Sequence, residues 1–133
     1  MFLERLMNQT NSPLLEQMLQ FTEARHRLIV ENMANIDTAG YQQKDLDVGK
    51  FQAMLRDRVD VRDRAAPGTV AFDDVAAEVE NPAHGILSHD GNNRSAERLA
   101  SDLAKNGMMH NLVVELLRKQ YQQMEMALKE KVT

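Results

Sequence analysis

Apolar side chains recur every three, four or seven positions near the start of the chain, which predicts a long amphipathic helix over Pro13–Ala34. Ser12 suits the N-cap, and Pro13 suits the first helical position, where its missing N–H would be unpaired anyway. This helix would be about 33 Å long, and we expect it to end near Asn35–Asp37, before Gly40. Its apolar stripe consists of Leu14, Leu15, Met18, Leu19, Phe21, Leu28, Ile29 and Met33.

A second and longer helical pattern begins after a cap at Asn92 or Asn93 and continues to about Lys131, a length of about 55 Å. Gly107 interrupts it at a cost of about 1 kcal/mol relative to Ala, and we expect a kink or a close helix contact there. Three apolar columns recur at multiples of seven: Leu103, His110, Leu117 and Met124; Leu99, Val113 and Ala127; and Ala100, Val114, Tyr121 and Leu128.

The middle of the chain, 42–92, has no comparable pattern and holds two of the three prolines and four of the six glycines. Phe51–Val61 favours a short helix with its apolar residues on one side. Pro67-Gly68 is typical of a turn, and Thr69–Phe72 predicts a short strand. The stretch 81–93 is rich in residues that favour loops.

These patterns predict a mainly α fold in a single domain, 1–133, in which the long N- and C-terminal helices pair as an antiparallel coiled coil or bundle. Its parts are the N-terminal helix and the residues that follow it (1–41), an irregular middle (42–92) and the C-terminal helix (93–133). The C-terminal helix would outrun its partner by about 20 Å. Both stripes are also wider than a two-stranded seam needs, so we expect apolar surface for protein–protein contact. A simple bundle closed by Phe2, Leu3 and Leu6 is the alternative.

Composition excludes several classes of function. The chain has 133 residues and no cysteine, which rules out disulfides and thiolate chemistry. Its formal net charge of −4 does not favour nucleic-acid binding. No apolar run approaches the roughly 18 residues of a membrane span. We therefore expect no membrane insertion. The first residues do not resemble a secretory signal peptide, so we expect any export to proceed without a cleaved signal.

The sequence offers no convincing enzyme site. A glycine-rich phosphate loop and a nucleophile elbow are both absent. His84, His89 and Asp90 would be the only candidate metal ligands, but their spacing is poor and solvated loop histidines are favoured. His26 and His110 lie on or beside apolar stripes and are interpreted as structural. We therefore expect no catalytic residue, no cofactor and no metal.

Two short segments carry the most information. The first, 32–41, is a helix end followed by a tight turn, in which Asn35 suits a left-handed helix cap and Gly40 permits a positive φ. Its six motif residues are Asn32, Ala34, Asn35, Thr38, Gly40 and Tyr41. The second is a turn that leads into the long helix, formed by Asp90, Gly91, Asn92 and Asn93.

Residues 25–41 resemble the N-terminal signature of the flagellar basal-body rod proteins, approximately Asn-Ile-Ala-Asn-x-x-Thr-Pro-Gly-Tyr. Met33 stands in place of the Ile and Ala39 in place of the Pro. The Asp90–Asn93 turn and the segment Tyr41–Asp47 resemble the proximal rod subunits of that family. Residues 48–89 carry almost none of the resemblance.

The resemblance implies a structural subunit, not an enzyme. Rod subunits pair their terminal helices and pack against neighbours in a tube that serves as the drive shaft through the periplasm. The implied partners are copies of the chain, other rod subunits, the ring-to-rod junction protein and the flagellar type III export apparatus, which exports such chains without a cleaved signal.

The residues expected to make the coiled coil and the subunit contacts lie on the two stripes. They are Leu15, Met18, Leu28, Ile29, Met33, Leu99, Leu103, Val113, Val114, Leu117, Tyr121, Met124 and Leu128. An alternative function is a cytoplasmic helical adaptor or export chaperone that binds a partner helix in the open stripe.

Overall fold

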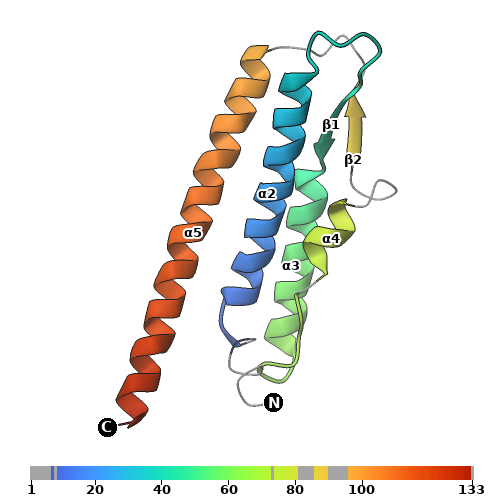
Figure 1. Ribbon diagram of the computed structural model, residues 1–133. Helices are drawn as coiled ribbons and strands as arrows, with labels where there is room; N and C mark the ends of the chain where they lie inside the picture. Colours follow the sequence, from blue (N-terminus) through green and yellow to red (C-terminus); the bar gives the residue numbers. More distant parts are fainter. Residues whose placement is uncertain (1–6, 8, 73, 81–85, 90–95, 133) are drawn as a thin grey trace.

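A computed structural model describes residues 7, 9–72, 74–80, 86–89 and 96–132. Helix α2 (Ser12–Ala34) lies at the centre of the molecule (Figure 1). Helix α5 (Ala96–Val132) packs along one side of it, and helices α3 (Val48–Arg64) and α4 (Val75–Glu80) lie on the other. The expected mainly α fold with long terminal helices is therefore confirmed.

Helix α2 begins one position earlier than the sequence predicts. Asn11, not Ser12, is the N-cap residue, and its side chain makes no capping hydrogen bond. Thr10 takes over this role, because its Oγ1 accepts a hydrogen bond from the Ser12 N–H at 3.2 Å. Ser12 itself is fully buried as the first helical residue.

At the other end of α2, Asn35 caps the helix as expected. Its φ is −108°, so the expected left-handed conformation was wrong.

The antiparallel pairing of α2 and α5 is also confirmed. Leu15 near the start of α2 packs with Val113 and Leu117 around the middle of α5. Leu99, in the first turn of α5, lies with Ile29, in the second half of α2, around one small cavity. Helix α5 has 37 residues and α2 has 23, so α5 is longer by about 20 Å and extends past the start of α2 (Figure 1).

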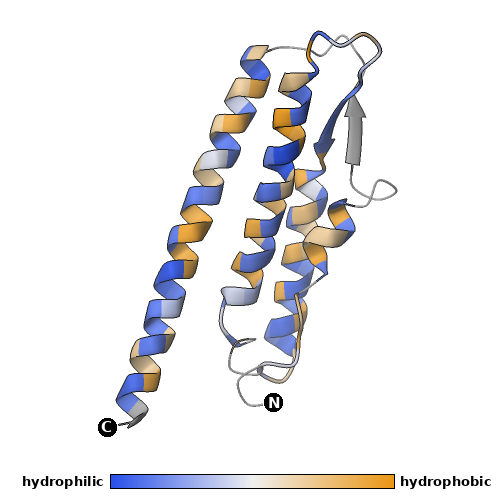
Figure 2. Cartoon of the chain, in the orientation of Figure 1, coloured by the Kyte–Doolittle hydropathy of each residue, from blue (hydrophilic) through white to orange (hydrophobic). Residues whose placement is uncertain are grey.

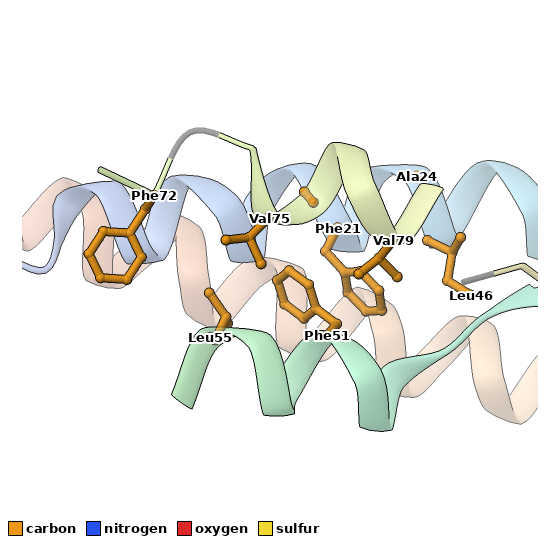
Figure 3. Close-up of a cluster of buried hydrophobic side chains, with 9 residues drawn as sticks. Phe21, Ala24, Leu46, Phe51, Leu55, Phe72, Val75 and Val79 are labelled. Carbon is orange, nitrogen blue, oxygen red and sulfur yellow. The ribbon is translucent and has the colours of Figure 1, made fainter. Parts of the chain in front are cut away.

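The middle of the chain supplies a hydrophobic core that the sequence analysis did not predict. The rings of Phe21 in α2 and Phe51 in α3 stack with their centroids 4.0 Å apart, and α4 covers the pair with Val75 and Val79 (Figure 3). Helix α3 contains the expected Phe51–Val61 helix and is longer at both ends. The core residues are Phe21, Ala24, Leu46, Phe51, Leu55, Phe72, Val75, Ala76 and Val79.

The predicted strand over Thr69–Phe72 is wrong. Phe72 is only 1% exposed because it packs into the core, with the Arg62 guanidinium 5.8 Å from its ring centroid. The apolar side chains Val70 and Phe72 therefore pack with the core, and the segment does not join a sheet. The antiparallel sheet forms elsewhere, between strands β1 (Gln43–Leu46) and β2 (Ile86–His89). The predicted turn at Pro67-Gly68 is supported by the positive φ of 77° at Gly68.

Gly107 lies within a continuous α5, since the helix has no break between Ala96 and Val132. A Cβ at this position would meet no atom within 4 Å, which excludes the close helix contact expected there. Hydrophobic residues follow α5 along its whole length, including the part beyond α2 (Figure 2).

The stacked aromatic pair is testable by truncation. Phe51→Ala removes one ring and leaves a cavity in the core, so we expect the free energy of unfolding to fall by about 3–5 kcal/mol, measured by urea denaturation. Gln52→Ala, at the exposed neighbouring position, is the control and is expected to change stability by less than about 0.5 kcal/mol. Equal denaturation midpoints for the two variants would contradict a core built on this pair.

Candidate functional site

The end of α2 is joined to strand β1 by the side chain of Asn32, which is 3% exposed. Its Nδ2 donates to the Lys44 carbonyl at 2.6 Å, and its Oδ1 accepts from the Lys44 N–H at 3.0 Å. One carboxamide thus satisfies both backbone groups of Lys44, as a neighbouring strand would. The Tyr41 hydroxyl donates to the same Oδ1 at 3.1 Å. We call this arrangement the helix-exit clamp.

The turn between Asn35 and Tyr41 is closed by short-range hydrogen bonds. The Asn35 Nδ2 donates to the Glu31 carbonyl at 2.9 Å, and the same carbonyl also accepts from the Asn35 N–H at 3.1 Å. The Thr38 N–H donates to the Asn35 carbonyl at 3.0 Å, and the Tyr41 N–H donates to the Thr38 carbonyl at 3.2 Å. Gly40 has a φ of +76°, which explains the glycine by backbone conformation, since a Cβ there would meet no atom within 4 Å.

Five of the six motif residues of 32–41 are therefore brought together by the fold, whereas the sixth, Ala34, is exposed. Their partner Lys44 was missed, because nothing in the local pattern indicates which backbone a buried Asn will reach. From the sequence, only Asn35 was given a role at the helix end, as its cap. The second motif, Asp90, Gly91, Asn92 and Asn93, lies outside the described residues, as does the proposed helix cap there.

A paired charge lies beside the helix-exit clamp. Arg25 donates from Nε to Asp45 Oδ1 at 3.0 Å and from a terminal nitrogen to Oδ2 at 3.1 Å, a two-point contact in which both side chains are mostly buried. Burial disfavours the charged guanidinium, but the hydrogen bond and charge of Asp45, with the charge of Asp102, outweigh this cost and raise the pKa of Arg25. The pair holds β1 against α2 just before the clamp.

Polar contacts also join α2 to α5. The Thr22 hydroxyl oxygen lies 2.9 Å from the Leu19 carbonyl oxygen, to which it donates, and 3.0 Å from His110 Nδ1, with which it forms a hydrogen bond across the helix pair. The Asn106 side chain donates to the Thr22 carbonyl at 2.8 Å. This arrangement agrees with a structural role for His110, whereas His26 is exposed.

Toward the far end of the helix pair, the Tyr121 hydroxyl donates to Glu16 Oε1 at 2.6 Å. This hydrogen bond, together with burial and the charge of Glu16, raises the pKa of Tyr121 to about 12. The contact lies near the start of α2, where Leu14 and Leu15 line a cavity together with Gln120 and Gln123 of α5.

The stripe residues divide into two groups. Those largely used within the chain are buried or half-buried: Leu15, Met18, Leu28, Ile29, Leu99, Leu103, Val113, Val114, Leu117 and Met124. Those that stay exposed are Met33, Tyr121 and Leu128. Most of the expected subunit-contact residues are therefore at least partly covered within the chain, either between α2 and α5, as Leu15, Val113 and Leu117 are, or against the core, as Leu28 is.

A different face of α5 carries most of its exposed apolar surface. Met108, Met109, Leu112 and Leu116 are 73%, 44%, 53% and 42% exposed, and we call them the α5 apolar face. Met109, Leu112 and Leu116 follow one another at helical spacing along the same side. Lys105 and Lys119, both exposed, continue that side at its two ends. The heptad columns missed these residues because they lie beside the buried stripe.

The α5 apolar face borders a groove whose floor is α2 and whose other wall is α3. A cavity of about 210 Å³ in this groove is lined by Met18 and Phe21 of α2, Val48 and Leu55 of α3, and Met109 of α5. Polar side chains also line this cavity, namely Thr22, Arg25, Gln52, Lys105 and Asn106, but most of its exposed lining is apolar. Such a surface suits the apolar face of an added helix.

Two classes of site are not found among the described residues. No group of three or more His, Cys, Asp or Glu there is placed to hold a metal ion. His84 and Asp90, candidates from the sequence, lie outside this part of the chain, and only the backbone of His89 is described. No helix in the described ranges is long and apolar enough to cross a membrane.

Comparison with known proteins gives one informative similarity. No family model matches the chain, and no solved structure matches it. The flagellar basal body rod protein FlgB of Salmonella typhimurium is 29% identical over 115 residues, an alignment that covers 77% of this chain and 80% of FlgB. The chain is similar to a flagellar rod protein. This similarity supports the resemblance seen in the residues around the helix exit.

The helix-exit clamp is testable by removing its carboxamide. Asn32→Ala leaves the Lys44 N–H and carbonyl without their partner, so we expect a loss of about 1–3 kcal/mol in unfolding free energy and faster hydrogen exchange at the Lys44 amide. Met33→Ala, an exposed neighbour on α2, is the control. Unchanged protection of the Lys44 amide in Asn32→Ala would show that the clamp does not hold β1.

The Tyr121–Glu16 contact predicts a pH dependence. The pKa of Tyr121 is about 12 in the folded chain, whereas the ordinary pKa of a tyrosine is 10.0. Between these two pH values the folded state therefore binds more protons than the unfolded state. The contribution of Tyr121 to stability is complete below pH 10 and is lost as the pH rises through 12. Glu16→Gln should move the pKa of Tyr121 toward 10.0, measured by absorbance titration of the phenol.

Glu23→Gln, at an exposed position of the same helix, is the matched control for the titration and should leave the pKa of Tyr121 unchanged. Tyr121→Phe identifies which of the two tyrosine transitions belongs to this residue. An identical upper transition in Glu16→Gln and the parent protein would contradict the assignment.

Proposed function

We propose that the protein is a structural subunit of the bacterial flagellar basal-body rod, most like the proximal subunit FlgB, and that it polymerises through its terminal helices into the drive shaft for motility. The similarity to FlgB supports the rod assignment. The residues around the helix exit also support it, since they resemble the family signature. The role is structural and not catalytic.

The exposed α5 apolar face is the observation that supports assembly. A soluble monomer rarely keeps a row of four large apolar side chains exposed along one helix unless the row serves as an interface. If the surface that receives this row lies elsewhere on the subunit, the contact joins copies head to tail. A head-to-tail contact that does not close generates a helical filament, which is what a rod requires.

The proposed partners are copies of this chain, other rod subunits and the ring-to-rod junction protein. The proposed site is the periplasmic rod of the basal body, reached through the type III export apparatus without a cleaved signal. Assembly contacts are assigned to the α5 apolar face together with the exposed stripe residues Met33, Tyr121 and Leu128. Buried stripe residues such as Ile29 and Leu117 test folding and not assembly.

A second candidate is a cytoplasmic helical adaptor or export chaperone, which the groove between α3 and α5 supports because it suits one partner helix. The two functions differ in location. A rod subunit copurifies with basal bodies, whereas an adaptor stays in the cytoplasmic fraction. Fractionation of cells that make the protein at its natural level distinguishes them.

The assembly surface is testable with one charge placed at two neighbouring positions. Leu112→Asp adds a carboxylate to the α5 apolar face, and Asn111→Asp adds the same charge to an exposed position on another side of the helix. We expect both variants to fold with the helical content of the parent, since neither position is buried. Leu112→Asp should fail to enter basal bodies and should abolish swimming, while Asn111→Asp should do neither.

Swimming and basal-body content are measured in cells whose own copy is replaced by each variant. Normal swimming with Leu112→Asp would remove the α5 apolar face from the interface. Recovery of the parent protein in the cytoplasmic fraction, and not with basal bodies, would favour the adaptor function.

A further inference from the structure

A small polar cavity lies where α2, β1 and α5 meet, behind the helix-exit clamp. Its volume is about 20 Å³. Gln43 and Asp45 of β1 line it from one side, since residues two apart on a strand face the same way. Arg98 and Asp102 of α5 line the other side, one helical turn apart, and Asn32 closes it from α2.

The Gln43 side chain is the unusual feature of this cavity. Gln43 is only 5% exposed, and its Nε2 is buried without a hydrogen-bond partner. Buried amide donors are nearly always paired, either with protein or with ordered water, because an unpaired one forfeits the hydrogen bonds it made to solvent. The position of Gln43 on the cavity wall indicates where its partner lies.

The neighbouring groups limit what this partner is. The Asn32 carboxamide is committed to Lys44 and Tyr41, and Arg98 offers only donors. Two carboxylates lie at the cavity wall, those of Asp45 and Asp102. The Asp45 oxygens already accept from Arg25 and from the Leu46 N–H, so Asp102 is the main acceptor. A ligand between the carboxylates and Gln43 must therefore accept from an N–H and donate to a carboxylate, which a water molecule does and a simple anion or metal cation does not.

The size of the cavity agrees with that chemistry. A volume of about 10–15 Å³ for the centre of a water-sized sphere is enough for one water molecule. The cavity is larger than this minimum but far smaller than a phosphate, a nucleotide or an organic ligand needs. Polar walls with both donors and acceptors are also the condition under which such a cavity is hydrated.

We propose that one ordered water occupies this cavity, accepts a hydrogen bond from Gln43 Nε2 and donates to the carboxylate of Asp102, with Asp45 as its second acceptor. The water joins β1 to the first turns of α5. Asn32 holds Lys44 directly, and the water holds the preceding residue, so two adjacent residues of β1 are fixed to the two long helices. This site lies within one chain and is independent of the proposed function.

The direct test is magnetisation transfer between water and the Gln43 side-chain amide in ¹⁵N-labelled full-length protein. At the Gln43 side-chain amide we expect a cross-peak to water whose sign is that of a long-lived bound water. At the exposed neighbour Gln42 we expect only exchange with bulk solvent. Gln43→Met keeps most of the side-chain length and removes both amide donors, and Gln42→Met is its matched control. Asp102→Asn, which weakens the acceptor without changing the volume, should shorten the residence time of the water.

A high-resolution crystal structure gives the second readout. Density for one water within hydrogen-bond distance of both Gln43 Nε2 and an Asp102 carboxylate oxygen would support the proposal. A direct hydrogen bond from Gln43 Nε2 to a protein atom, an anion or cation at the site, or equal bulk-type exchange at Gln42 and Gln43 would each overturn it. The measurements on the parent protein decide the matter even if a variant does not fold.

Discussion

The structure depends on the burial of α2 on two sides. Leu15 and Ile29 lie toward α5, while Phe21 and Ala24 lie toward α3 and α4. A helix with apolar residues on so wide an arc is not satisfied by one partner helix. The middle of the chain must therefore fold back to cover the second side, and the stacking of Phe21 on Phe51 is the contact through which it does so. The helix-exit clamp and the hairpin follow from this return of the chain.

Helix α5 is in the opposite situation, because among the described elements only α2 contacts it extensively. Val113 and Leu117 are buried, whereas Leu112 and Leu116, each one position earlier, are about half exposed. The same helix thus combines a face that stabilises the fold with a face whose apolar side chains stay exposed. Such a division agrees with the similarity to a rod protein, since exposed apolar surface of this kind is typical of an interaction site.

Much of the secondary structure could be predicted from the sequence, because helical periodicity is a local property. Both long helices, their antiparallel pairing and the helix around Phe51 follow from the spacing of apolar residues. The strand expected at Thr69–Phe72 was wrong because a short apolar run has no period that separates a strand from a core-packed loop. Strand β1 was missed because Gln43–Leu46 carries little apolar signal and is stabilised by its partners.

The motif of 32–41 shows the same limit. From the sequence alone, Asn32 lies in the last turn of the predicted helix, Asn35 fits a helix cap, and Gly40 fits a turn. Only the fold shows what the two amides bind, because the Asn32 amide contacts a backbone twelve residues away while that of Asn35 stays within its own helix. The sequence by itself determined where helices form and how the turn is made, since these depend on neighbours along the chain. The tertiary structure decided which apolar residues are covered and which polar groups meet, because both depend on contacts between segments far apart in sequence.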